Sequence, residues 1–226
     1  SLYTIIPMIE LIYGVWFIEG GMYTLAKGMA QLFQELGGSL HLNAPVDEIL
    51  LEGKKAKGIR IGEETISAEY VVCNADFPYA MKHLLPDEAT RGKYTDKKID
   101  QMDYSCSCFI LYLGTDKKYP VESLHTIRFA KDFEKNVSDI FDAGIPPEDP
   151  SFYAYVPTSL DPSLAPENHE GIYVLVPVPE LSKYDQWTEE NTAAYRDKII
   201  ELLKTETRFH DIEEHLVFEK IYTPET

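Results

Sequence analysis

The stretch "SCSCFILYLGTD" at residues 105–116 is an apolar run of strand length, bounded by polar turn residues. Its aromatic and apolar content predicts a buried strand. Four more strands are expected after it, in "LHTIRFA", "SFYAYVP", "GIYVLVPVP" and "HLVFEKIYT". Helical segments at 131–142 and 188–206 interleave with them. We therefore predict that residues 96–226 form an α+β domain, a mixed β-sheet with helices on one side.

Before this domain, the spacing of apolar residues changes from helical to β-like. Residues 3–13 predict a helix. A second predicted helix follows and ends at Gly37-Gly38. Its apolar residues make one stripe at helical spacing: Leu25, Met29, Leu32, Phe33 and Leu36. Short β-rich runs between residues 46 and 74 then predict a meander of four strands, the last in "EYVVCN". Asp76 is expected to cap a short helix with Pro78 in its first turn.

Composition and charge exclude several classes of protein. The chain has 226 residues, 44% of them hydrophobic, and a formal net charge of −17. Such a surface repels phosphate backbones and offers anionic lipid no polybasic patch, so nucleic acid is not expected as a partner. Three cysteines, Cys73, Cys106 and Cys108, do not indicate a disulfide framework, and a reducing compartment is favoured.

No metal site or familiar catalytic motif is visible in the sequence. Cys106 and Cys108 share one strand face, but no second pair of ligands stands at a zinc-binding spacing. The six histidines are scattered, with no metal-binding pair on a predicted helix. We predict no metal, and we treat both cysteines as core residues.

The adjacent glycines in "FIEGGMYTLAKGMAQL", residues 17–32, are the first candidate for a binding site. A glycine pair lets a backbone approach another object closely, at a cost in chain entropy. Two interpretations remain open on these residues alone. The pair before the helix either packs tightly against other protein, or it admits a cofactor.

Blocks in a fixed order along nearly the whole chain carry a family resemblance. They are "SLYTIIPMIELIYGVWFIEGGMYTLAKGMAQL", "NAPVDEIL", "CNADFP", "MDYSCSCFILYLGTD", "LHTIRFAKDFEKNVSDIFD", "EDPSFYAYVPTSLDPSLAPE", "GIYVLVPVPEL" and "IYTPET". The sequence resembles the carotenoid (phytoene-type) desaturases of the flavin amine oxidase superfamily, and is most similar to their bacterial dehydrosqualene (4,4'-diapophytoene) branch. The resemblance implies a central fragment of such an enzyme.

The resemblance implies a division of the chain into three parts. Residues 1–36 would be helices where flavin and substrate meet, 37–77 strands of an FAD-binding, Rossmann-like domain, and 78–226 the substrate-binding domain. The glycine-rich turn that cradles the flavin pyrophosphate at the start of such enzymes is not in this sequence. We therefore expect FAD in the full-length enzyme, and we expect this chain alone neither to retain it nor to be active.

Site residues are carried over from the resemblance position by position. The residues implied to lie beside FAD are Gly20, Gly21, Met22, Val46, Asn74, Ala75 and Asp76. The candidate substrate contacts, on a sheet whose apolar face would wall a tunnel, are Tyr112, Phe152, Tyr153 and Tyr155. No catalytic acid or base is assigned.

The implied reaction is dehydrogenation of a linear isoprenoid hydrocarbon, dehydrosqualene or phytoene, by hydride transfer to flavin. Two other classes stay open: another oxidoreductase of the superfamily, similar to retinol saturase, and a non-enzymatic lipid-binding module. The apolar start of the chain, interrupted by Pro7 and Glu10, is not a spanning helix. We expect a cytoplasmic protein with peripheral contact to the inner face of the membrane. We also expect self-association through the exposed strand edge of the meander.

Overall fold

The computed structural model describes residues 4–119 and 124–226, which fall into two compact units. The first, here called the sheet unit, holds the described residues of Ser1–Leu32 and Ser105–Thr226. The second, the small unit, is Phe33–Tyr104. The sequence prediction placed the boundary at residue 77, whereas residues 78–104 group with the small unit.

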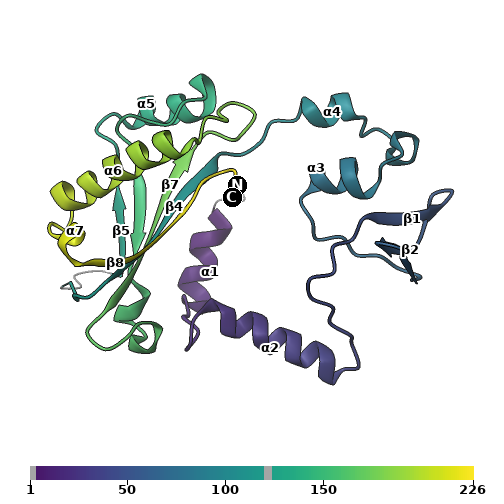
Figure 1. The fold of residues 1–226 in the computed structure, drawn as a ribbon, viewed down its shortest axis with the longest axis horizontal. Coiled ribbons are helices and arrows are strands. Elements are labelled where there is room, and N and C mark those ends of the chain that lie inside the picture. The colour runs from purple at the N-terminus through teal and green to yellow at the C-terminus, as the bar shows by residue number, and fades with distance from the viewer. Residues whose placement is uncertain (1–3, 120–123) are drawn as a thin grey trace. The chain divides into compact units, whose positions relative to one another are not determined.

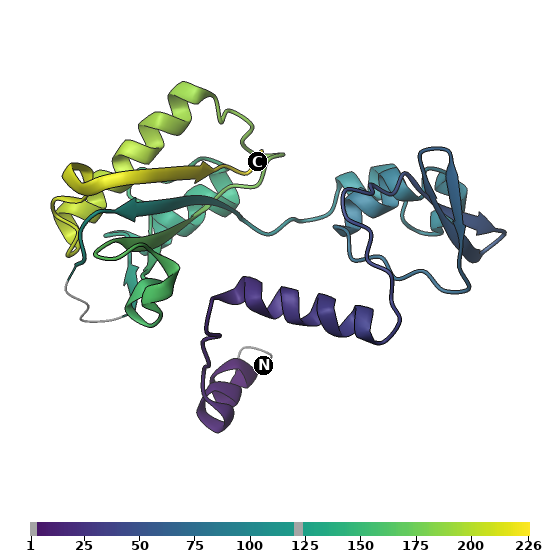
Figure 2. The same cartoon turned by 60° about the horizontal axis from the view of Figure 1, so that its bottom comes forward.

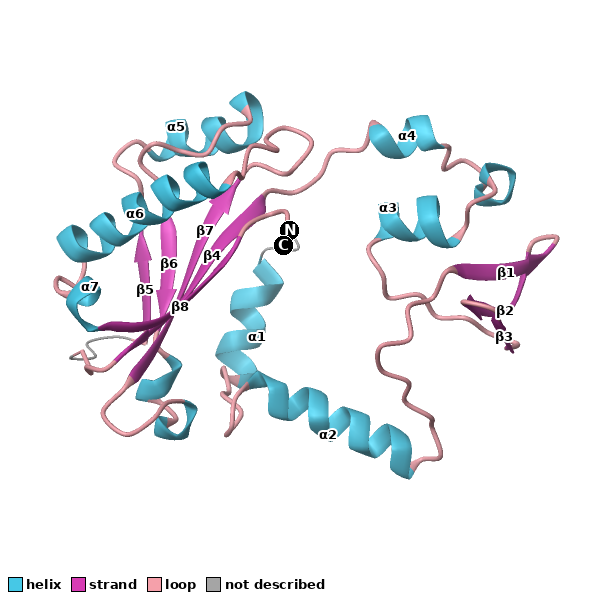
Figure 3. Ribbon diagram, viewed as in Figure 1, coloured by secondary structure: helices cyan, strands magenta, loops and turns pink. Residues whose placement is uncertain are grey.

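Five strands of the described residues form the sheet of the sheet unit, in the spatial order β5-β6-β7-β4-β8 (Figures 1 and 3). Their bounds are β4 Ser107–Thr115, β5 His125–Arg128, β6 Phe152–Tyr155, β7 Glu170–Val178 and β8 Leu216–Tyr222. Every predicted strand is present, and β8 lies beside β4 (Figure 2). Neighbours run antiparallel throughout the described pairs, so the expected mixed sheet is an antiparallel one.

Helices cover one face of this sheet, as predicted (Figure 1). They are α5 Phe133–Ser138, continued by a wider turn at Asp139–Ala143, and α6 Glu189–Glu206; the short α7 Ile212–His215 precedes β8. The Thr188 side chain accepts a hydrogen bond from the N–H of Asn191, which satisfies a free donor at the start of α6. Thr188 therefore caps the helix that the sequence predicts at 188–206.

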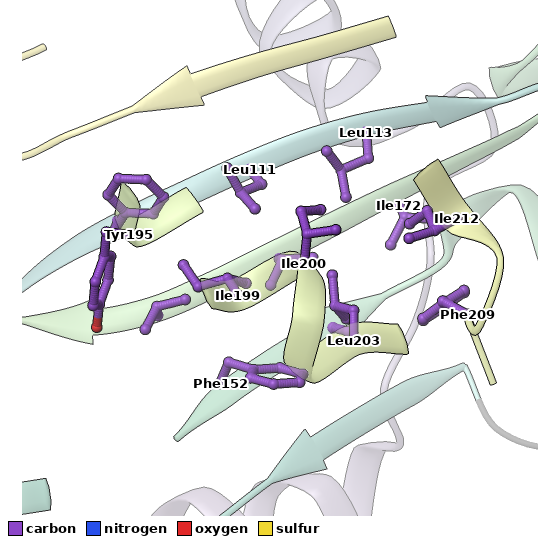
Figure 4. Packing of buried hydrophobic residues seen from close by; sticks show 14 of the residues in the cluster. Leu111, Leu113, Phe152, Ile172, Tyr195, Ile199, Ile200, Leu203, Phe209 and Ile212 are labelled. Atoms are coloured by element: carbon purple, nitrogen blue, oxygen red, sulfur yellow. The ribbon is translucent and has the colours of Figure 1, made fainter. Parts of the chain in front are cut away.

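Strict alternation along β7 separates the two faces of the sheet. Residues of β7 alternate between buried and half-buried along its whole length, because successive side chains point to opposite faces. The buried set packs under α6 against residues such as Ile199, Ile200 and Leu203, which are at most 1% exposed (Figure 4). The other set faces away from the helices, so it is free to line a binding surface.

The small unit contains a three-stranded antiparallel sheet and two short helices. Its described elements are β1 Glu48–Glu52, β2 Lys55–Ile61, β3 Glu64–Ser67, α3 Phe77–Tyr79, with a wider turn at Ala80–Leu84, and α4 Asp96–Asp100. The fourth predicted strand, 69–74, is not formed: no described strand lies beside it, and Val72 is 93% exposed. A single extended segment has no ladder of hydrogen bonds to stabilise it. β1 and β3 are the edges of this sheet, and self-association through an edge stays a prediction.

Two helices precede these elements. α1 Ile5–Tyr13 is apolar except for Glu10, with no buried side chain among its described residues. α2 Met22–Glu35 follows the glycine pair, as predicted, and ends before Gly37.

A buried arginine joins β5 to the end of α6. Arg128 is 6% exposed, and its guanidinium donates to both carboxylate oxygens of Glu206 at 2.8 and 3.0 Å and to the carbonyl of Pro150 at 2.9 Å. It also pairs with Asp149. The hydrogen bonds from Arg128 lower the pKa of Glu206 below its ordinary value. Paired and hydrogen-bonded in this way, the buried charge stabilises the fold.

Removing the Glu206 charge should therefore weaken the fold in a pH-dependent way. Because the folded-state pKa of Glu206 is lowered, its contribution is present above the ordinary glutamate pKa and is lost as pH falls through the folded value. We expect Glu206→Gln to reduce the free energy of unfolding by about 1–3 kcal/mol at pH 7 and by less at about pH 3, below the ordinary glutamate pKa. Urea unfolding at both pH values measures this. Glu190→Gln, exposed on the same helix, is the control, and an equal loss at both pH values would contradict the assignment.

Candidate functional site

A long groove of about 1180 Å³ lies on the face of the sheet turned away from α6. Its floor is made by side chains of the outward-facing set, among them Tyr112, Tyr155 and Tyr173. One wall is the loop between β6 and β7, with Leu160 and Leu164, and another is the segment 15–22 before α2. The groove lies within the sheet unit, and most of the side chains around it are apolar.

The glycine pair forms a turn that closes one side of this groove. Gly20 and Gly21 have φ angles of +78° and +82°, a conformation that residues with a side chain rarely adopt. The N–H of Gly20 donates to Oδ2 of Asp161 at 2.7 Å, across 141 residues of sequence. A Cβ atom on Gly21 would come within 3.4 Å of Leu164. The turn thus packs on the β6–β7 loop of the same chain.

Asp161 is itself held in place for this contact. Its Oδ1 accepts hydrogen bonds from the hydroxyl and the N–H of Ser163, at 2.6 and 3.0 Å. These bonds and the one from Gly20 lower the pKa of Asp161, so the carboxylate is charged at neutral pH. A negative charge before the first turn of α2 is favourable, because the N-terminus of a helix carries a partial positive charge.

Gly20 and Gly21 contact Asp161 and Leu164 of the same chain, and their contact with FAD stays a prediction. Met22 lines the groove and is exposed. The remaining predicted cofactor contacts belong to the small unit, where Val46 is half-buried and Asn74, Ala75 and Asp76 are exposed. Contact between these residues and FAD stays a prediction.

The predicted substrate contacts lie on both faces of the sheet. Tyr112 and Tyr155 line the groove. Tyr153 lies two residues before Tyr155 on β6 and therefore on the same face of the sheet. Phe152 does not: it is 2% exposed and packs under α6 on the opposite face (Figure 4). Adjacent strand residues point to opposite sides, so Phe152 is a core residue rather than a groove contact.

Sequence reasoning missed many groove residues, among them the aromatic Tyr173 and His125. Tyr173 is directly opposite Tyr112 in the register of β7 and β4. The alternation in "GIYVLVPVP" was the signal that put Tyr173 on the face opposite Ile172 and Val174. Burial raises the pKa of Tyr155 and of Tyr173, so these rings are neutral at physiological pH.

Within residues 4–119 and 124–226, no cluster of three or more His, Cys, Asp or Glu side chains can hold a metal ion. The three cysteines are free thiols in the structure.

Residues 8–210 match a family model described as flavin containing amine oxidoreductase. The chain is 43% identical over 230 residues to a 4,4'-diapophytoene desaturase (4,4'-diaponeurosporene-forming) of Staphylococcus aureus strain MRSA252. It is 42% identical over 229 residues to the protein of that name from Staphylococcus haemolyticus strain JCSC1435. Each comparison covers 99% of this chain and 46% of the relative, so the chain spans about half the length of these curated relatives.

Two solved structures share the fold. A crystal structure of an oxidoreductase from Methanosarcina mazei has a TM-score of 0.55 and 17% identity, over 90% of this chain and 42% of that one. A protein of Pyrococcus furiosus has a TM-score of 0.58 and 19% identity, over 94% of this chain and 45% of that one. At these identities the likeness concerns the fold alone.

The Asp161 contact generates a prediction for the groove wall. Asp161→Ala removes the acceptor of the Gly20 N–H, so the turn should open more often. We expect hydrogen exchange at the Gly20 amide to become about fivefold faster, as for the loss of about 1 kcal/mol of hydrogen bonding. Amide exchange followed by nuclear magnetic resonance measures this. Asp185→Ala, exposed after β7, is the matched control, and an unchanged Gly20 rate in Asp161→Ala would show that the contact does not hold the turn.

Proposed function

The chain belongs to the flavin containing amine oxidoreductase family, and from this premise we propose that it is the central part of an FAD-dependent desaturase of linear isoprenoid hydrocarbons. The relatives named 4,4'-diapophytoene desaturase support dehydrosqualene as the substrate. Phytoene, the longer hydrocarbon of the same class, is the alternative.

The observation that carries the proposal is the apolar groove on the open face of the sheet. A hydrocarbon has no polar group by which it can be recognised, so its site must bind it through apolar and aromatic surface. The groove, at about 1180 Å³, is larger than the roughly 300–1,000 Å³ of pockets for drug-sized ligands, which suits a long chain. Burying such a chain removes it from water and supplies the binding free energy.

The residues of this chain contribute binding and orientation. In desaturation a hydride leaves one carbon and a proton leaves the next, and the FAD that the family implies supplies the hydride acceptor when it is bound. The tyrosines of the floor and the leucines of the β6–β7 loop hold the hydrocarbon in one plane. The segment 15–22 covers it from one side and excludes water.

Two alternatives remain from the sequence: another oxidoreductase of the same family, and a lipid-binding module without catalysis. A groove of this kind suits a lipid carrier as well. Product formation by the full-length protein separates the classes, because a carrier binds the hydrocarbon and leaves its double bonds unchanged.

We also propose that the protein contacts a membrane surface through α1. The helix exposes large apolar side chains, including Leu11 at 87% and Ile12 at 62%. Exposed apolar surface of this extent is typical of a membrane or protein contact. None of the helices in the described ranges is long and apolar enough to cross a bilayer. Lipid-borne substrate would reach the groove from such a surface.

The proposed activity is tested in bacteria that make 4,4'-diapophytoene and contain the full-length protein. We expect coloured products with conjugated double bonds, measured by their absorption after chromatography. Leu160→Glu places a carboxylate in the groove, and we expect at least a tenfold loss of product, because the charge must be desolvated when the hydrocarbon binds. Leu181→Glu, similarly exposed but outside the groove, should retain activity. Colourless extracts with the wild-type protein, or full activity in Leu160→Glu, would contradict the proposal.

Membrane contact is tested by flotation of the protein with phosphatidylcholine vesicles, whose surface does not repel a chain of net charge −17. We expect Leu11→Glu to reduce the floating fraction at least fivefold, because it places a charge on the apolar helix. Leu42→Glu, exposed in the small unit, is the control. Equal flotation of both variants would mean that α1 is not the contact.

A further inference from the structure

Four aromatic side chains form one straight row across the floor of the groove. His125 on β5 is paired directly with Tyr155 on β6, Tyr155 with Tyr173 on β7, and Tyr173 with Tyr112 on β4. All four line the groove. With strands about 4.8 Å apart, the row spans roughly 14 Å perpendicular to the strands. We call these four residues the aromatic row.

Ring contacts join the two pairs at the ends of the row. The His125 and Tyr155 rings are stacked, with centroids 5.1 Å apart and planes within 10°. Tyr112 and Tyr173 lie 5.2 Å apart with planes tilted by 60°. From the next row, Tyr153 donates to or accepts from Nδ1 of His125 at 2.7 Å and stacks beside Tyr155. The hydrogen bond and the stacking restrain the rings of His125 and Tyr155.

We propose that the aromatic row determines specificity for conjugation: it binds the conjugated, planar part of an isoprenoid chain in preference to a part with isolated double bonds. The inference rests on the proposed function, since it concerns what the same groove binds. It names a property of the bound chain that apolar lining alone does not select.

Two physical effects favour the conjugated chain. A conjugated polyene is flat, and its π-electron faces can contact the faces and edges of aromatic rings. It is also rigid, so ordering it in the groove costs little conformational entropy, whereas a chain with rotatable single bonds loses that freedom on binding. A row of aromatic rings therefore favours binding of a chain that is both flat and rigid.

In a desaturase, the affinity of the groove for the bound chain would change as the reaction proceeds. Each double bond that extends the conjugated system lengthens the flat segment that fits the row. Affinity therefore rises as the reaction proceeds, and a partly desaturated chain is retained in preference to being exchanged for fresh substrate. The length of the row then limits how much of the conjugated segment gains this contact.

The test compares two probes of equal chain length in the full-length protein. Methyl trans-parinarate is conjugated and fluorescent, and its binding is read directly; methyl α-linolenate carries isolated double bonds and is measured by competition. We expect the conjugated ester to bind at least fivefold more tightly. Equal affinities would overturn the inference while leaving the groove as a hydrocarbon site. Failure of both esters to bind would overturn the proposed groove and the inference together.

Variants of the row distinguish stacking from bulk. We expect Tyr155→Leu and Tyr173→Leu each to lower the preference for the conjugated ester at least threefold, because leucine keeps apolar surface but removes the ring. Tyr155→Phe and Tyr173→Phe should keep the preference, because the ring remains. Tyr70→Leu, exposed in the small unit, is the matched control. If Tyr173→Leu does not fold, Tyr112→Leu at the exposed end of the row replaces it. A preference that survives the leucine variants would overturn the proposal.

Discussion

The two-residue alternation of side chains along β4 and β7 is the constraint on which the rest of the structure depends. One set of side chains is sealed beneath α6 and supplies the core of the sheet unit. The same backbone must then present the other set on the opposite face. Since that second set is rich in tyrosine and carries no charged residue at its centre, the open face becomes an apolar floor. Core and groove are therefore two results of one pattern.

The contact between Gly20 and Asp161 completes the groove from a distant part of the chain. A segment of the N-terminal region forms a wall only because its turn is tied to the β6–β7 loop. The glycine conformation allows the close approach, and the carboxylate supplies both a hydrogen-bond acceptor and a charge suited to the start of α2. The glycine pair thus serves the groove by shaping the protein around it.

The family and the groove support two different parts of the proposed function. Family membership implies a flavin enzyme, and the groove favours a ligand without polar groups. In the proposed function, this chain binds and orients the hydrocarbon, while the redox chemistry belongs to the cofactor. The proposed role of the aromatic row adds selection among hydrocarbons, because aromatic rings favour a flat and rigid chain over a flexible one.

The sequence by itself determined the local elements and the family. It predicted the helical segment at 188–206 that forms α6, the apolar runs placed all five strands of the larger sheet, and the ordered blocks indicated the flavin amine oxidase superfamily. It did not determine that the sheet is antiparallel, or that residues 69–74 lack a partner strand. Nor did it separate Phe152, in the core, from Tyr155, in the groove, or identify Asp161 as the partner of Gly20. These features depend on strand register and on contacts between residues far apart in the chain, which local propensity and periodicity do not encode; only the tertiary structure decided them.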